Sequence, residues 1–188
     1  MDERNYENPE FWQWVEAHIT DDPSALRLKW HGKMPWVNQA IMQIECRNKA
    51  AKKLHEELSY PTFYFPTALS AEQCTGDSLA HFHTSLINEG DTVIDLTCGL
   101  GIDALHMAGK ASSVTAIDVN KELTDALDHN AKAMGIKNIM AINADCCEWI
   151  KSCNARFDVA FIDPARRGDM GQRLFNLADC SPNCLLYT

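Results

Sequence analysis

The fold of this chain is decided by the stretch Val93-Ile-Asp-Leu-Thr-Cys-Gly-Leu-Gly-Ile-Asp103. It starts in a short apolar strand expected over 92–96, passes Gly99 and Gly101, and enters a helix expected over 102–108. Glycines at this place let the backbone turn sharply and let a ligand approach the main chain. The next expected strand ends in Asp118, whose carboxylate is placed to accept hydrogen bonds from both hydroxyls of a ribose.

The alternation of strands and helices continues beyond this stretch. Strands are expected over 92–96, 113–117, 139–142 and 157–162, and helices over 102–108, 122–134 and 146–151. Short apolar strands separated by helices predict βαβ units and a parallel sheet. We therefore expect an α/β fold with a Rossmann-like parallel sheet over residues 89–188.

The preceding residues 1–88 predict a helical N-terminal domain. Helices are expected from Pro9, after Ser24, over 37–58 and over 77–87, with a capping box at Ser70-Ala-Glu-Gln73. The tryptophans at positions 12, 14, 30 and 36 are expected in the core and at the domain junction, and His81 and His83 in packing roles.

Charge and cysteine usage exclude several classes of protein. The net charge is −9, which argues against generic nucleic-acid binding, but residues 26–60 carry seven bases against three acids. Arg47, on an apolar helix stripe, is expected to snorkel or pair with a buried acid. Lys49, Lys52 and Lys53 lie on the opposite face; this is either a solvated surface or, with Arg47, a contact for RNA.

Eight cysteines include no C-x-x-C pair, so we expect reduced thiols and no metal. The chain has no apolar run near the ~20 residues that span a bilayer and no apolar signal core, so we expect a cytoplasmic protein without membrane contact.

The residues around the two glycines distinguish between cofactors. A dinucleotide fingerprint needs a third glycine, and Ala104 stands at that position. Asp95 would repel a pyrophosphate but attract the cationic amino group and sulfonium of S-adenosyl-L-methionine (SAM). The sequence therefore favours SAM over NAD.

Four segments carry a resemblance to a known family. They are Val93–Asp103, Ala116-Ile-Asp-Val-Asn120, Asn143-Ala-Asp-Cys146 and Phe157-Asp-Val-Ala-Phe-Ile-Asp-Pro-Ala-Arg166. In this order they resemble motif I, motif II, the adenine-contacting segment and motif IV of class I SAM-dependent methyltransferases. Glu72-Gln-Cys-Thr75 and Asp163-Pro-Ala-Arg-Arg167 are similar to segments of the THUMP-like RNA methyltransferases. The resemblance implies a SAM-dependent methyltransferase that acts on RNA.

The resemblance also implies roles for individual residues. The methionine end of SAM would be held by Asp95, Cys98 and Gly99, with Gly101 giving close backbone approach. Asp118 would bind the ribose, and Asp145 and Cys146 the adenine, although Asp145 reads equally well as a helix N-cap. Gln73 and Thr75 would close the pocket. In the strand order 3-2-1-4 of this family, Asp163, Pro164 and Arg166 would lie beside motif I, where the target atom meets the methyl group. The family's complete sheet has more strands than the four expected here, and only 26 residues follow position 162, so we expect the sheet to be incomplete, truncated after strand four or five.

Motif IV departs from the pattern of base-amine methylases. Those enzymes carry an aromatic residue that stacks on the target base, whereas this chain has Ala165 and Arg166, and Arg166 or Arg167 suits a phosphate instead. The string is also similar to that of uridine C5 methylases, which require a cysteine nucleophile; Cys180 and Cys184 are the nearby candidates.

Three other interpretations stay open. The strand-end acids Asp95, Asp118 and Asp163 are alternatively simple turn residues. The chain is alternatively a non-catalytic SAM- or RNA-binding fragment, or a nucleotide-dependent oxidoreductase. Asp95 and Ala104 disfavour the oxidoreductase.

Overall fold

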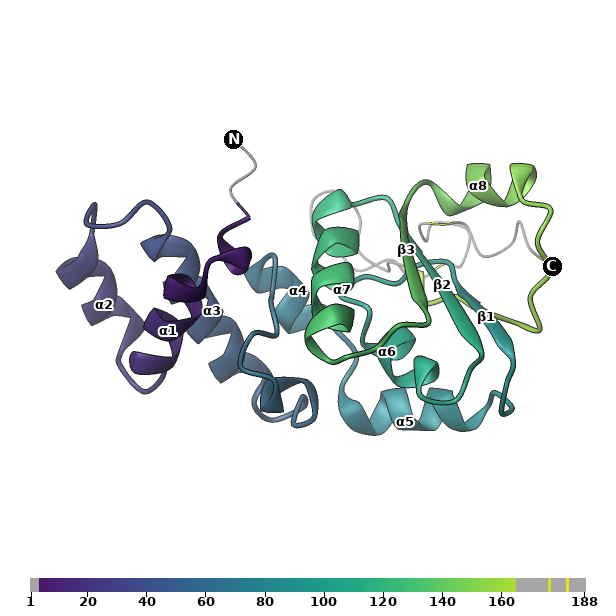
Figure 1. The fold of residues 1–188 in the computed structure, drawn as a ribbon, viewed down its shortest axis with the longest axis horizontal. Helices are drawn as coiled ribbons and strands as arrows, with labels where there is room; N and C mark the ends of the chain where they lie inside the picture. Colours follow the sequence, from purple (N-terminus) through teal and green to yellow (C-terminus); the bar gives the residue numbers. More distant parts are fainter. Residues whose placement is uncertain (1–3, 165–175, 177–181, 183–188) are drawn as a thin grey trace.

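The computed structural model describes residues 4–164, together with Asn176 and Pro182 (Figure 1). Within these residues the helices and strands follow one another as η1 (Asn5–Glu7), α1 (Pro9–Ala17), α2 (Pro23–Trp30), α3 (Val37–Ala50), η2 (Glu57–Ser59), α4 (Ala68–Gln73), α5 (Asp77–Ser85), β1 (Thr92–Asp95), α6 (Ile102–Ala108), β2 (Ser113–Asp118), α7 (Lys121–Ala133), β3 (Ile139–Asn143), α8 (Cys146–Ser152) and β4 (Val159–Phe161). None of the helices in this described part is long and apolar enough to cross a bilayer.

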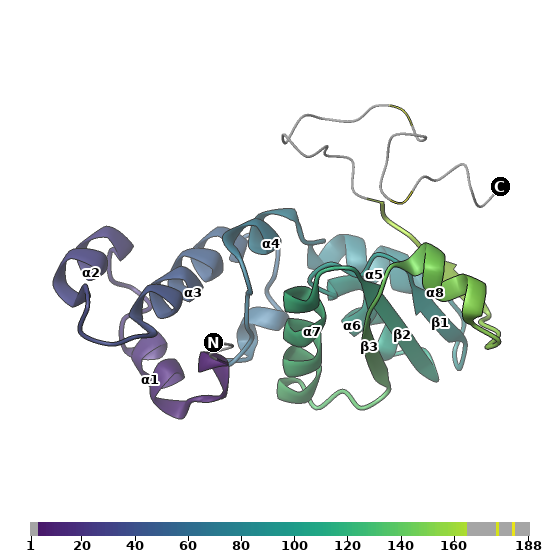
Figure 2. The same cartoon turned by 90° about the horizontal axis from the view of Figure 1, so that it is seen from above.

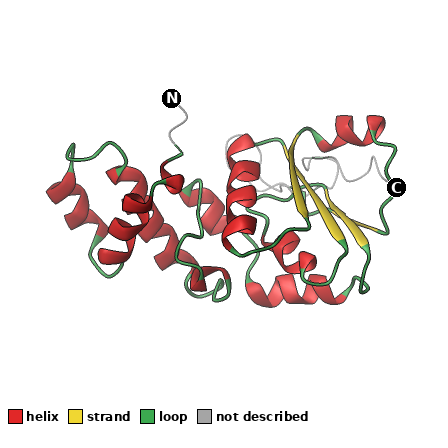
Figure 3. Ribbon diagram, in the orientation of Figure 1, coloured by secondary structure: helices red, strands yellow, loops and turns green. Residues whose placement is uncertain are grey.

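The four described strands form one parallel sheet in the order β3-β2-β1-β4 (Figure 3). Asp95, the last residue of β1, lies opposite Ala116 of β2 and Phe161 of β4. Asp118, the last residue of β2, lies opposite Asn143 of β3. The predicted α/β fold and strand order are confirmed, and the register brings the acidic strand ends to one edge of the sheet.

Helices cover both faces of this sheet. On one face, Val93 and Val114 pack in the main core together with Leu105 of α6 and Leu127 of α7. On the other face, Ile94 and Ile117 pack with Cys146 of α8, and partly buried hydrophobic residues join them. Successive residues of a strand point to opposite faces, so both faces are apolar, as expected for a central parallel sheet.

The N-terminal helices form the other end of an elongated molecule (Figures 1 and 2). Their core contains Phe11, Trp12, Trp14 and Trp36 packed against Ile41. The predicted placement of these three tryptophans is confirmed; Trp30 is only partly buried at the edge of the same cluster.

An extended segment joins the two ends of the molecule. The backbone of Tyr64 exchanges two hydrogen bonds with the side-chain amide of Asn130 on α7, at 2.7 and 3.0 Å. The backbone of Phe65 does the same with Gln43 on α3, at 3.0 and 2.7 Å. Both amide side chains are fully buried, so α3 and α7 are held to the same short piece of backbone. The boundary at residue 88 stays a prediction.

Two predicted helix boundaries are wrong. The helix expected over 37–58 ends at Ala50, because the chain turns there and carries Leu54 into the main core. The capping box expected at Ser70 and Gln73 instead joins Thr67 and Ser70, so α4 starts at Ala68. Ser70 is the third residue of the helix and returns a hydrogen bond to the cap.

Candidate cofactor site at the strand ends

Asp95 is the most deeply buried acid at the strand ends. It is 1 % exposed, and its Oδ1 accepts a hydrogen bond from the Thr97 amide at 3.1 Å. Burial raises the pKa of Asp95 to about 8, and the negative charges of Asp103, Asp118 and Asp163 add to the rise. A cation at this carboxylate would compensate for the missing solvation.

The loop from Cys98 to Gly101 follows directly. Gly99 has φ +53° and Gly101 has φ +85°, a left-handed backbone that favours glycine. A Cβ on Gly101 would lie 2.4 Å from Cδ1 of Leu127 on α7. Glycine at position 101 therefore permits both the left-handed backbone of the turn and the close approach of α7. The Cys98 amide donates to the Ile117 carbonyl at 2.9 Å and fixes the loop against β2.

Asp118 holds this loop from the neighbouring strand. Its Oδ2 accepts from the Gly99 amide at 2.9 Å, and its Oδ1 accepts from the Asn120 amide at 2.8 Å. The side chain of Asn143 donates to the carbonyls of Asp118 and Val119 at 3.0 and 2.8 Å. Asn143 was not singled out from the sequence, although its place at the end of β3 was the available signal.

Asp145 and Cys146 lie at the start of α8. Asp145 is exposed, and its carboxylate accepts from the amides of Cys147 at 2.8 Å and Glu148 at 3.1 Å. The N-cap interpretation of Asp145 is thus confirmed, and its role toward adenine stays a prediction. Cys146 is buried against β1 and β2.

Asp103 is a buried acid that sequence reasoning did not single out. It lies in the first turn of α6, 7 % exposed, and accepts from Thr75 Oγ1 at 2.5 Å and pairs with His83 Nδ1 at 2.7 Å. Thr75 is therefore joined to the start of α6, as the prediction that it approaches the pocket requires. Gln73 is exposed at the end of α4. The packing role expected for His83 is incomplete, because its ring also binds a carboxylate.

Asp163 and Pro164 follow β4 next to the glycine loop. The Asp163 amide donates to Thr97 Oγ1 at 2.8 Å, which ties the segment after β4 to the residues after β1. The Asp163 side chain is exposed and adds to the negative potential on Asp95. Arg166, Arg167, Cys180 and Cys184 lie outside the described residues.

Two of the four basic residues expected to contact RNA, Arg47 and Lys53, instead donate hydrogen bonds to backbone carbonyls. Arg47 donates to the carbonyls of Pro61 and Phe63 at 2.7 and 2.8 Å and lies over the Trp12 ring. Lys53 donates to the carbonyls of Glu72 and Cys74 at 2.8 and 2.7 Å.

These contacts correct the expectation for Arg47 and Lys53. Burial lowers the pKa of Arg47 to about 10, and its donors are aimed at backbone carbonyls inside the fold. The Arg47 guanidinium does not snorkel, and it pairs with no acid among the residues that the structure describes. Lys49 and Lys52 remain exposed.

The strand-end geometry suits a cationic ligand with a ribose. The carboxylates of Asp103, Asp118 and Asp163 lie close enough to act electrostatically on that of Asp95. A pyrophosphate would meet like charge there, whereas a sulfonium or ammonium would meet opposite charge. The residues present therefore fit SAM better than a dinucleotide.

Comparison with known proteins supports this assignment. Residues 93–167 match the family model of a methyltransferase domain. The 23S rRNA (uracil(747)-C(5))-methyltransferase RlmC of Shewanella halifaxensis is 34 % identical over 101 residues, covering 52 % of this chain and 26 % of that protein. The 23S rRNA (uracil(1939)-C(5))-methyltransferase RlmD of Vesicomyosocius okutanii is 36 % identical over 88 residues, covering 44 % and 20 %.

One solved structure matches most of the chain. The crystal structure of a proposed methyltransferase from Porphyromonas gingivalis W83 superposes with a TM-score of 0.81 and 28 % identity. The match covers 97 % of this chain and 45 % of that one. The chain thus spans about a quarter of the length of the curated relatives and under half of this structural neighbour.

Proposed function

We propose, from the match of residues 93–167 to the model of a methyltransferase domain, that this protein binds SAM as class I methyltransferases do and takes part in the methylation of RNA. The observation that carries the proposal is the buried Asp95 carboxylate directly before the glycine loop. Its environment favours a positively charged partner, and SAM brings one in its sulfonium and another in its amino group.

The proposed cofactor contacts follow the strand ends. Asp95 and the backbone of Gly99 and Gly101 would hold the methionine part of SAM. Asp118 would accept from the ribose hydroxyls; an ionised carboxylate has about four acceptor sites, and two amides occupy Asp118 in the structure. Asp145 and Cys146 would face the adenine. Bound SAM supplies an electrophilic methyl group, and the protein's part is to align it with the target atom.

The RNA substrate rests on the relatives and on a few residues. The names of the two rRNA methyltransferases above give 23S rRNA as their substrate. We propose that Lys49 and Lys52 contact phosphates, together with Arg166. Glu72-Gln-Cys-Thr75 and Asp163-Pro-Ala-Arg-Arg167 support membership of the THUMP-like group. An RNA substrate is consistent with a cytoplasmic protein.

Methylation of uracil C5 is a second candidate for the reaction, because both relatives carry that activity in their names. This chemistry needs a reactive cysteine thiolate. Cys98 is poorly suited, since burial and the neighbouring Asp95 and Asp118 raise the pKa of its thiol. Cys180 and Cys184 remain the candidates, and Asp163 would serve a nitrogen or oxygen nucleophile instead.

The cofactor proposal is tested by calorimetric titration of SAM, S-adenosylhomocysteine and NAD into the wild-type chain, Asp118→Ala and Asp125→Ala. Asp125 is a matched control, because it is a half-buried acid on α7 whose carboxylate pairs with Lys121. We expect micromolar binding of SAM and its product, no binding of NAD, and a loss of at least about tenfold only in Asp118→Ala. Binding of NAD alone would instead support the oxidoreductase.

The substrate proposal is tested by incubating the chain with methyl-labelled SAM and bulk RNA and analysing the nucleosides. Label in 5-methyluridine that disappears in Cys180→Ser or Cys184→Ser supports the uracil reaction. Label on a base nitrogen or a ribose oxygen that disappears in Asp163→Asn supports the other. SAM binding without label transfer would identify a non-catalytic SAM-binding module.

A further inference from the structure

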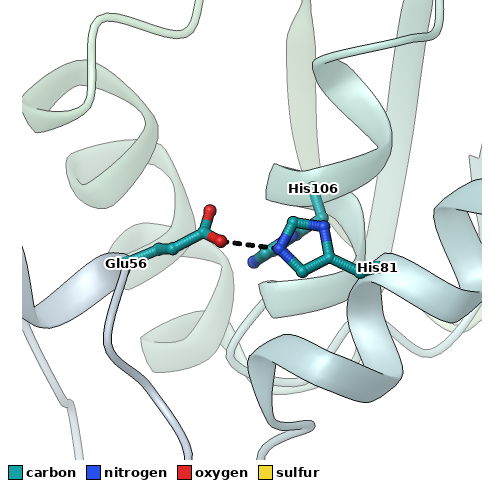
Figure 4. A group of neighbouring side chains, drawn as sticks. All are labelled: Glu56, His81 and His106. Atoms are coloured by element: carbon teal, nitrogen blue, oxygen red, sulfur yellow. Dashed lines mark hydrogen bonds and ion pairs between the residues drawn. The ribbon is translucent and has the colours of Figure 1, made fainter.

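Three side chains with metal-binding atoms meet where the segment before η2 crosses α5 and α6. They are Glu56 before η2, His81 on α5 and His106 on α6 (Figure 4). His81 Nε2 lies 2.6 Å from Glu56 Oε1, and the two imidazole rings are 4.6 Å apart at 88°. One ligand atom from each of the three lies within 4.8 Å of the others.

His106 is held by a fully buried acid through Nε2, which leaves Nδ1 for an ion. Its Nε2 lies 2.8 Å from Glu57 Oε1, and the two side chains are 6 % and 0 % exposed. The histidines that bind metals in proteins are usually oriented in this way by a carboxylate. His81, by contrast, is 56 % exposed, as is Glu56, which gives an ion a path from solvent.

The same place holds more buried negative charge than its hydrogen bonds satisfy. Asp77 lies next to Glu57, and its Oδ2 accepts from the amide of His55 at 2.7 Å. Glu57 Oε2 and Asp77 Oδ1 are both buried, and among the described residues neither lies in hydrogen-bond geometry with a partner, although the two carboxyl groups lie close enough for Glu57 to act on the pKa of Asp77. Unpaired buried carboxylate oxygens are costly. His55 Nδ1 lies 3.3 Å from Asp77 Oδ2, and a bound cation would add to the compensation that this contact gives.

We propose that Glu56, His81 and His106 bind a divalent transition-metal ion of the Zn²⁺ type, with Glu57 and Asp77 as the surrounding charge. Zn²⁺ takes imidazole nitrogen and carboxylate oxygen together, and three protein ligands leave a position for water. On binding, the metal takes the place of the proton between His81 Nε2 and Glu56 and of any proton on His106 Nδ1, and these protons leave to solvent while the His106–Glu57 contact stays. The ion would join the residues before η2 to α5 and α6.

The competing explanation is a pair of ordinary histidine–glutamate ion pairs with no metal. A second competitor is adventitious binding to cysteine thiolates, since the chain has eight cysteines. Titration with Co²⁺ separates all three, because visible d–d bands report the coordination geometry and an intense near-ultraviolet band reports thiolate ligands.

The experiment titrates Co²⁺ and Zn²⁺ into the full chain after removal of metal by chelator, with a thermal unfolding scan of each sample. The variants are His81→Ala and Glu56→Gln, both at exposed positions that leave the core intact. His31→Ala is the matched control, since His31 is an exposed histidine at the end of α2.

We expect one Co²⁺ per chain with d–d bands and no thiolate band. Affinity should fall at least about tenfold in His81→Ala and in Glu56→Gln and stay unchanged in His31→Ala. Metal should raise the melting temperature of the wild type and not of His81→Ala. Three outcomes would overturn the proposal: no binding, binding with a thiolate band, or equal affinity in His81→Ala and His31→Ala.

Discussion

The backbone amide of Gly99 donates a hydrogen bond to the Asp118 carboxylate 2.9 Å away, and this contact joins the loop after β1 to the end of β2. The acid proposed to hold the ribose therefore also shapes the loop proposed to hold the methionine part of the cofactor. Any change at Asp118 acts on both, so stability and binding have to be measured together.

Asp118→Ala removes acceptors from the amides of Gly99 and Asn120. We expect the free energy of unfolding to fall by about 2 kcal/mol, because hydrogen bonds to charged groups contribute about 1.5–3 kcal/mol. Asp118→Asn retains one amide oxygen and should lose less. Urea denaturation measures both. Equal stability of Asp118→Ala and wild type would mean that the Gly99 contact contributes nothing.

Gly101→Ala tests the close approach of α6 and α7. The new Cβ would clash with Leu127 and require a non-glycine residue at φ +85°, so we expect a loss of about 2–4 kcal/mol. Gly135→Ala is the control, because Gly135 has φ +74° and open space around its Cβ position. The free energy of unfolding of Gly135→Ala should fall only by the cost of the left-handed backbone, about 1–2 kcal/mol. Combining Gly101→Ala with Leu127→Ala should recover part of the clash term but not the backbone term.

The raised pKa of Asp95, about 8, predicts opposite effects of pH on folding and on cofactor binding. An unfolded aspartate has a pKa of about 3.9, so between pH 4 and 8 the folded state holds a proton that the unfolded state lacks. Stability contributed by protonated Asp95 therefore falls as pH rises through this window. Asp95→Asn should gain stability relative to the wild type over the same range.

Binding of a cation needs the ionised carboxylate, so SAM affinity should rise between pH 6 and 8 with release of up to one proton. Calorimetry in two buffers of different ionisation enthalpy counts that proton. Release that persists in Asp95→Asn would assign it to another group.

Arg47→Ala separates a structural role from an RNA contact. Loss of the guanidinium leaves the carbonyls of Pro61 and Phe63 without their donor, so we expect a loss of about 2–3 kcal/mol in urea denaturation. Lys49→Ala and Lys52→Ala should change stability by at most about 0.5 kcal/mol while weakening RNA binding in a salt-dependent way. A stable Arg47→Ala chain with weakened RNA affinity would reverse these roles.

Local patterns in the sequence predicted most of the strands and helices of the α/β part. The expected helix 102–108 matches α6 at both ends, because a glycine starts it and apolar residues repeat along it. The strand order came from the resemblance to the methyltransferase family, not from local patterns. The helix expected over 37–58 was too long, because the turn after Ala50 is imposed by the burial of Leu54 in a core built from distant residues.

Long-range partners were beyond sequence reasoning. Nothing local to Arg47 shows that three carbonyls of residues 60–63 surround it. The same holds for Glu56, His81 and His106, which lie on separate segments and form no short metal motif. Asp103 lay inside the stretch that decided the fold, but only the structure shows Thr75 and His83 against it.

The hydrogen bonds to the backbone of Tyr64 and Phe65 have a consequence for the binding of a large substrate. The side chains of Gln43 and Asn130 make four hydrogen bonds to the backbone of these two adjacent residues. Through this backbone the N-terminal helix α3 is joined to α7, which packs on the sheet. A substrate bound to the N-terminal helices would reach the strand ends at a fixed distance from its binding site. That distance would limit which atom of a long substrate can lie at the strand ends.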